Sequence, residues 1–148
     1  MQNAYKLSVF YYLIFTMLLV LSAIMIFDQK IGFSFTGVLE YYTGNEEKFI
    51  PAQTSMGILK IVLPHIFVFG LISMVLLHFL VFTKLRYKKI TIHLIYLTFI
   101  TALLEIFTPL LIVNGFEFFA FVKLLSFFIF LSLIVYISWL LFYSITKE

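Results

Sequence analysis

The chain has 148 residues, of which 64% are hydrophobic and 11% are charged, and its formal net charge is +3. A soluble domain usually carries about 25% charged residues, and a soluble fold of this length could not hide so much apolar surface. The composition therefore excludes a soluble domain. The chain has no cysteine, which excludes thiolate catalysis and cysteine-ligated zinc or iron–sulfur sites.

Four long apolar runs fill most of the chain, at Leu7–Phe27, Ile58–Thr83, Ile90–Val113 and Phe118–Tyr143. A membrane-spanning helix needs roughly 20 apolar residues, because the hydrocarbon core is about 30 Å thick and a helix rises about 1.5 Å per residue. Each run meets this length. We therefore predict an all-α integral membrane protein, a four-helix antiparallel transmembrane bundle that forms one domain within the lipid bilayer.

The first two spans carry small and hydroxylated residues, which let transmembrane helices approach closely. In the first span, four of them fall within one narrow sector at 3.6 residues per turn: Ser8, Tyr12, Thr16 and Ala23. In the second span, Gly70 and Ser73 have the same character. We expect both sets to face the interior of the bundle.

The link at 28–57 is the one loop long enough for structure of its own. Thr36–Thr43 predicts a short interfacial helix, which Gly44 and Asn45 would end, and whose apolar residues would touch lipid or protein. Thr54 or Ser55 can cap the second span. Two interpretations stay open, namely a structured flap over one end of the bundle and a simple tether.

The link between the second and third runs is basic, with Lys84, Arg86, Lys88 and Lys89. Positive residues at a membrane edge stay on the cytoplasmic side, so nucleic-acid binding is a poor interpretation of this charge. We predict a bacterial inner (cytoplasmic) membrane protein with both termini and residues 84–89 in the cytoplasm and residues 28–57 outside. An aromatic belt at the cytoplasmic edge agrees with this orientation: Tyr5, Tyr11, Tyr12, Tyr87, Trp139 and Tyr143.

Three ionisable residues fall at one depth, on the order of 10 Å below the outer boundary, and are His65, Glu105 and Lys123. Ionisable groups in a bilayer are costly, and a Glu–Lys pair beside a histidine would neutralise charges that lipid cannot solvate. We predict a buried polar cluster of these three residues. It either fixes helix register or forms a proton, quinone or ion site. Pro109 removes a backbone bond to the carbonyl of Glu105 and leaves that carbonyl free for such a site.

Two further histidines, His78 and His93, fall at matching depth near the inner ends of the second and third spans. Two facing imidazoles between adjacent helices are the geometry of a bis-histidine haem site. The competing interpretation is a pair of ordinary interfacial histidines near the head groups. No other metal site is indicated.

Several short motifs resemble a group of small bacterial four-span inner-membrane proteins of unassigned function. These motifs are Tyr41-Tyr42-Thr43-Gly44-Asn45, Pro51, Pro64-His65-Ile66-Phe67, His78-Phe79-Leu80 and Glu105-Ile106-Phe107-Thr108-Pro109. The resemblance covers most of the chain. It implies the four-span architecture and supplies no activity.

Three functions remain in competition. The first is a non-enzymatic accessory or assembly subunit of a membrane complex, for which a respiratory complex is one candidate. Its expected partner is another membrane protein or a second copy of the chain. The second is a redox subunit that binds one haem b through His78 and His93, with a quinone or proton site at His65, Glu105 and Lys123. The third is a proton or ion conduit through Glu105. An enzyme is disfavoured, because no nucleophile–base pair or metal-ligand spacing appears.

Overall fold

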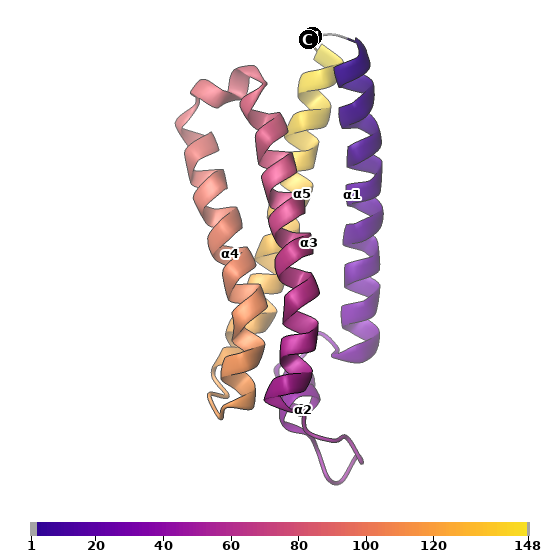
Figure 1. The fold of residues 1–148 in the computed structure, drawn as a ribbon, viewed down its shortest axis with the longest axis vertical. Coiled ribbons are helices and arrows are strands. Elements are labelled where there is room, and N and C mark those ends of the chain that lie inside the picture. The colour runs from indigo at the N-terminus through magenta and orange to yellow at the C-terminus, as the bar shows by residue number, and fades with distance from the viewer. Residues whose placement is uncertain (1–2, 148) are drawn as a thin grey trace.

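Within residues 3–147, which the structure describes (at 86 and 87 by the backbone alone), the computed structural model has five α-helices and one short 3₁₀ helix (Figure 1). Their bounds are α1 Asn3–Lys30, α2 Phe35–Thr43, α3 Ser55–Val81, η1 Lys84–Tyr87, α4 Lys89–Val113 and α5 Phe119–Lys147. Helices α1, α3, α4 and α5 are long and apolar enough to cross a membrane, and they pack together. The prediction of an all-α, four-helix transmembrane bundle is confirmed.

Capping residues fix both ends of the short helix α2, which Gly44 ends as predicted. Ser34 caps α2 by accepting a hydrogen bond from the Gly37 amide at 2.9 Å, and Gly44 ends the helix at φ +83°. Thr54, rather than Ser55, caps α3 by accepting from the Gly57 amide at 3.0 Å. The helices α1 and α5 extend past their apolar runs, because polar residues at a span end continue the helix beyond the hydrocarbon core.

The helix ends differ from the ends of the apolar runs by a few residues. The second apolar run reaches Thr83, but α3 ends at Val81. Thr83 starts the η1 turn instead, since its hydroxyl accepts from the Leu85 amide at 3.1 Å. The side chains of Arg86 and Tyr87, which belong to the predicted basic link and aromatic belt, lie outside the described part of the chain.

Helix α5 is the centre of the bundle, because α1, α2, α3 and α4 all contact it. Helix α1 packs chiefly on α5 and is tied to α3 by two tyrosine hydroxyls. Tyr5 donates to the Phe79 carbonyl at 3.3 Å, and Tyr12 donates to the Ile72 carbonyl at 3.4 Å. Since these bonds join α1 to the second half of α3, the first half of α3 is free of them.

The predicted small-residue faces were only partly right. Thr16 and Ser73 are buried, and Tyr12 is half-buried. Ser8 is exposed, and its hydroxyl bonds the Ala4 carbonyl of its own helix at 2.9 Å. Gly70 is exposed as well, with open space where a Cβ would lie. Ser8 and Gly70 therefore do not face the interior, whereas Thr16 and Ser73 do.

The interior of the bundle carries polar side chains as well as apolar ones. The buried side of α4 carries a row of hydroxyls and one carboxylate: Thr91, Thr98, Thr101, Glu105 and Thr108. Large apolar residues such as Phe15 and Phe67 are exposed instead. This distribution fits a protein whose surroundings are hydrocarbon, because a lipid-facing surface disfavours polar side chains.

The two ends of the bundle differ. Helix α1 begins and α5 ends at the end that holds η1, which we call the η1 end (Figure 1). The loop with α2 covers the opposite end, which we call the α2 end (Figure 1). Since α2 contacts both α4 and α5, this loop is a packed flap and not a simple tether.

Candidate functional site

A buried ion pair joins α4 and α5 near the α2 end. Glu105 and Lys123 are only 4% and 6% exposed, and the Lys123 ammonium contacts the Glu105 carboxylate directly. The ammonium also donates to the backbone carbonyl of Glu105 at 2.9 Å. Pro109 has no amide hydrogen to occupy that carbonyl. Lys123 therefore compensates both a side-chain charge and a backbone acceptor that the proline leaves unpaired.

Ser126 completes the network. Its hydroxyl lies 3.1 Å from the second carboxylate oxygen of Glu105 and 3.1 Å from the backbone carbonyl of Lys123. Lys123 and Ser126 lie three residues apart on α5, so both side chains reach the same side of the helix. Both carboxylate oxygens thus have a partner. Among the described residues, two of the three ammonium hydrogens have an acceptor and the third has none.

The flap brings Tyr42 to this region. Tyr42 is 4% exposed. Burial raises the pKa of its phenol, and the electrostatic interactions with Glu105 and Tyr41 raise this pKa further. The phenol is therefore protonated at any physiological pH and can donate a hydrogen bond. Among the described residues its hydroxyl has no hydrogen-bond partner.

A cavity of about 380 Å³ lies beside the pair and draws on all five α-helices. Its polar lining residues are Ser22, Lys30, Tyr41, Tyr42, His65, Glu105 and Lys123. The remaining wall is apolar, with Phe27 of α1 stacked on Phe127 of α5 at 4.0 Å between ring centroids. We call this space the α2-end cavity.

His65 lines the α2-end cavity but makes no hydrogen bond to the pair. Its Nδ1 lies 2.7 Å from the Ile61 carbonyl, which can only accept, so Nδ1 carries a hydrogen. In the neutral ring Nε2 is then an acceptor. Lys30, in the last turn of α1, adds an exposed ammonium to the same cavity.

The structure does not bring His78 and His93 together inside the bundle. His78 is exposed and lies two positions from both Leu76 and Leu80, which are fully buried, so it points to the opposite side of α3. His93 is also exposed, and its Nδ1 lies 2.9 Å from the Lys89 carbonyl of its own helix. Among the described residues, no three His, Asp or Glu side chains gather as a metal site.

Two residues of this site had no place in the predicted cluster. Ser126 could have been found, because it follows Lys123 at the spacing that shares a helix face. Tyr42 could not, since its position depends on how the loop folds back over α4 and α5. The short motif around Tyr42 was the one sequence feature that singled it out.

Fold and site together define a polytopic helical membrane protein with a charged, ligand-sized cavity at one end. A family model described as a transmembrane helical domain matches residues 32–148. The chain belongs to this transmembrane helical domain family, Aq_1264_TM. The match covers α2 to α5, which hold Tyr42, His65, Glu105 and Lys123, and α1 lies before it. Comparisons with curated proteins and with solved structures found no significant match.

Proposed function

We propose that this protein is a non-enzymatic membrane protein whose α2-end cavity binds the head group of a membrane-dissolved quinone. The observation that carries the proposal is the Tyr42 phenol, which is buried, protonated and without a partner beside a ligand-sized space. Tyr42 lines the cavity, so a ligand oxygen there could accept a hydrogen bond from this phenol.

The size of the cavity suits a head group. Small-molecule pockets measure about 300–1,000 Å³, so 380 Å³ lies at the lower end and is too small for a whole lipid. The parts of α1 and α3 that line the cavity include the apolar residues Leu19, Ile26 and Ile61. The tyrosine bonds between α1 and α3 lie toward the η1 end. A hydrophobic tail can therefore leave the cavity between these two helices.

The polar groups suit a neutral, carbonyl-bearing ring. Tyr42 and the third hydrogen of Lys123 are donors for a carbonyl oxygen, and Nε2 of His65 is an acceptor for a hydroxyl. An anionic head group would meet the Glu105 carboxylate at the same depth. The aromatic rings of Phe27 and Phe127 offer stacking surfaces.

The wider role that we propose is an accessory or assembly subunit of an inner-membrane complex. On the positive-inside rule, the lysines near the η1 end belong in the cytoplasm with both termini. The acidic Glu46 and Glu47 then lie outside together with the flap. In this orientation the proposed quinone site lies in the outer half of the bilayer.

The two alternative roles have less support. A haem between His78 and His93 would need both rings to face one gap, whereas both residues are exposed on separate helices. An ion conduit through Glu105 would need this carboxylate to leave Lys123 and Ser126 during each passage. Neither alternative accounts for the unpartnered phenol of Tyr42.

Binding can be measured on the purified protein in detergent by titration calorimetry with a short-chain quinone. We expect saturable binding to the wild type and roughly tenfold weaker binding to Tyr42→Phe, since a hydrogen bond contributes about 0.5–1.5 kcal/mol. Tyr96→Phe is the matched control, because Tyr96 is exposed on α4 and remote from the cavity lining. Equal affinity in wild type and Tyr42→Phe, or no saturable binding, contradicts the proposal.

A further inference from the structure

His65 carries an acceptor nitrogen that no described residue occupies. Its Nδ1 lies 2.7 Å from the Ile61 carbonyl, so the hydrogen of a neutral ring is on this atom. Nε2, at the outer end of the ring, then has a lone pair and no hydrogen, and among the described residues it has no hydrogen-bond partner. The ring also packs edge-on against Phe69, at 5.3 Å between ring centroids, which limits its rotation.

The charges around His65 favour the neutral ring. Glu105 is the one carboxylate among the described residues that line the α2-end cavity, and the Lys123 ammonium already compensates its charge. Lys30 adds a further positive charge to the same cavity. A protonated His65 would therefore lack a counter-ion within a membrane-spanning segment, where unpaired charge is costly. Nε2 is thus an acceptor for a ligand that enters the cavity.

The other groups of the cavity do not distinguish a carbonyl from a hydroxyl. Lys30 and Lys123 only donate, and the protonated phenol of Tyr42 donates as well. A donor bonds a ligand oxygen whether that oxygen belongs to a carbonyl or to a hydroxyl. An acceptor differs, because only a hydroxyl has a hydrogen to give it. The Ser22 hydroxyl is a weaker acceptor than an imidazole nitrogen, and it already bonds a carbonyl of its own helix at 2.8 Å.

We infer that the α2-end cavity selects the reduced quinol over the oxidised quinone, and that His65 is the specificity-determining residue. The inference rests on the quinone site proposed above. The two forms share one ring and one tail and differ by two hydrogens, so both fit the same space. The quinol donates a hydroxyl to Nε2 of His65 and accepts from Tyr42 or Lys123. The quinone places a carbonyl lone pair against the lone pair of Nε2 instead.

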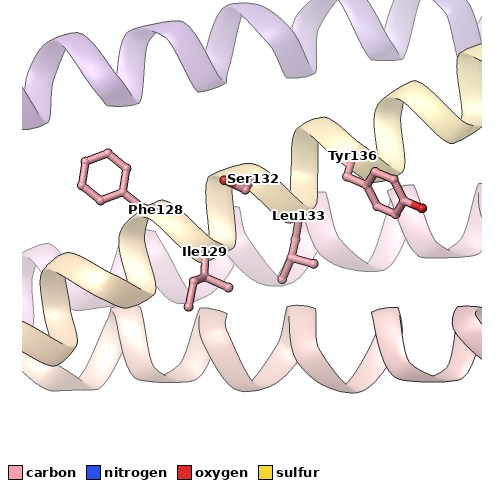
Figure 2. A pocket seen from close by; sticks show the side chains of 5 residues that line it. All are labelled: Phe128, Ile129, Ser132, Leu133 and Tyr136. Carbon is pink, nitrogen blue, oxygen red and sulfur yellow. The ribbon is translucent and has the colours of Figure 1, made fainter.

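A hollow on α5 provides a comparison for unselective binding. It measures about 340 Å³ and is lined by Phe128, Ile129, Ser132, Leu133 and Tyr136 (Figure 2). Its polar side chains are two hydroxyls, which both donate and accept. A hydrophobic ligand that partitions into this hollow therefore meets no side chain that tells the two redox forms apart.

Titration calorimetry under argon with a short-chain benzoquinone and, separately, with its quinol tests the selection. The chain has no cysteine, so the reductant that keeps the quinol reduced has no thiol or disulfide to act on. We expect the wild type to bind the quinol several-fold more tightly than the quinone. His65→Phe should bind the two forms with equal affinity. His65→Gln should keep the preference, because its side-chain carbonyl also accepts a hydrogen bond.

Three further variants serve as controls. His93→Phe is the matched one, because His93 is exposed and its Nδ1 also lies near the carbonyl four residues earlier, at 2.9 Å, but it is not part of the cavity lining. His93→Phe should keep the wild-type preference, as should Tyr136→Phe in the α5 hollow. Tyr42→Phe should weaken the binding of both forms alike, since a phenol donor serves either.

Different results overturn different parts of the proposal. Equal affinity of the wild type for the two forms, or tighter binding of the quinone, overturns the selection and leaves the quinone site in place. A preference that persists in His65→Phe, with a melting curve that shows a folded protein, overturns the role of His65. Loss of the preference in Tyr136→Phe moves the ligand to the α5 hollow and overturns it as well. If neither form binds saturably, the proposed quinone site itself is wrong.

Discussion

The Lys123 ammonium bonds the backbone carbonyl of Glu105 at 2.9 Å, in addition to the carboxylate of the same residue. The carbonyl is available because Pro109 cannot donate to it. The ammonium of Lys123 on α5 therefore replaces a backbone hydrogen bond that is missing within α4. Glu105, Pro109 and Lys123 act as one structural unit, and the α2-end cavity is built against it.

Removal of Lys123 alone should be strongly destabilising. In Lys123→Met the Glu105 carboxylate and its carbonyl lose their donor inside a low-dielectric bundle, and the loss of one partner of a buried pair costs about 3–5 kcal/mol. We expect a clear fall in the melting temperature of the purified protein, followed by circular dichroism in detergent. Lys60→Met is the control, because Lys60 is exposed near the start of α3 and should melt like the wild type.

Removal of both charges should cost far less. Replacement of a buried ion pair by apolar residues of similar volume is often neutral. We therefore expect Glu105→Met combined with Lys123→Met to melt closer to the wild type than Lys123→Met does. A double variant at least as unstable as the single one would show that the charges themselves, and not their mutual compensation, hold α4 against α5.

Pro109→Ala isolates the backbone contribution. Alanine restores an amide hydrogen that can bond the Glu105 carbonyl within α4. The carbonyl then needs Lys123 less, so Lys123→Met should cost about 1 kcal/mol less in the Pro109→Ala background than in the wild type. A double-mutant cycle of melting curves measures this difference. Strict additivity of the two changes would mean that the carbonyl bond contributes nothing.

The flap should respond to acid through Glu40. The Lys48 ammonium, 2.8 Å away, and the Asn45 amide lower the pKa of this carboxyl below its ordinary value. Since the folded pKa is the depressed one, the stabilisation is complete above the ordinary pKa and is lost as the pH falls through the folded value. We expect loosening of the loop below about pH 4, measured as proteolysis between α2 and α3. Glu40→Gln should already show the acid behaviour at neutral pH, whereas Glu47→Gln should not.

The spans were predictable from the sequence because a hydrocarbon surrounding dictates their length and composition. The side chains that each span turns inward were less predictable. Ser8 was expected inside from its polarity, yet a hydroxyl can satisfy itself on its own backbone, as Ser8 does on Ala4. The charges of Glu105 and Lys123 cannot be satisfied by their own helix backbones in this way. Their matching depth in the membrane was therefore enough to predict that they pair. Tyr42 was beyond reach, because its place depends on a loop fold with no periodic signal.

The orientation of the bundle is the remaining prediction, and it decides which side of the membrane the cavity faces. The positive-inside rule places residues 84–89 in the cytoplasm and Glu46 outside. Glu46 and Lys88 are both exposed, in the flap and next to η1, so a cysteine at either position is accessible from its own side. An impermeant thiol reagent added to intact spheroplasts should label Glu46→Cys and leave Lys88→Cys unlabelled until the cells are opened. The reverse pattern would place the α2-end cavity in the cytoplasmic half of the bilayer.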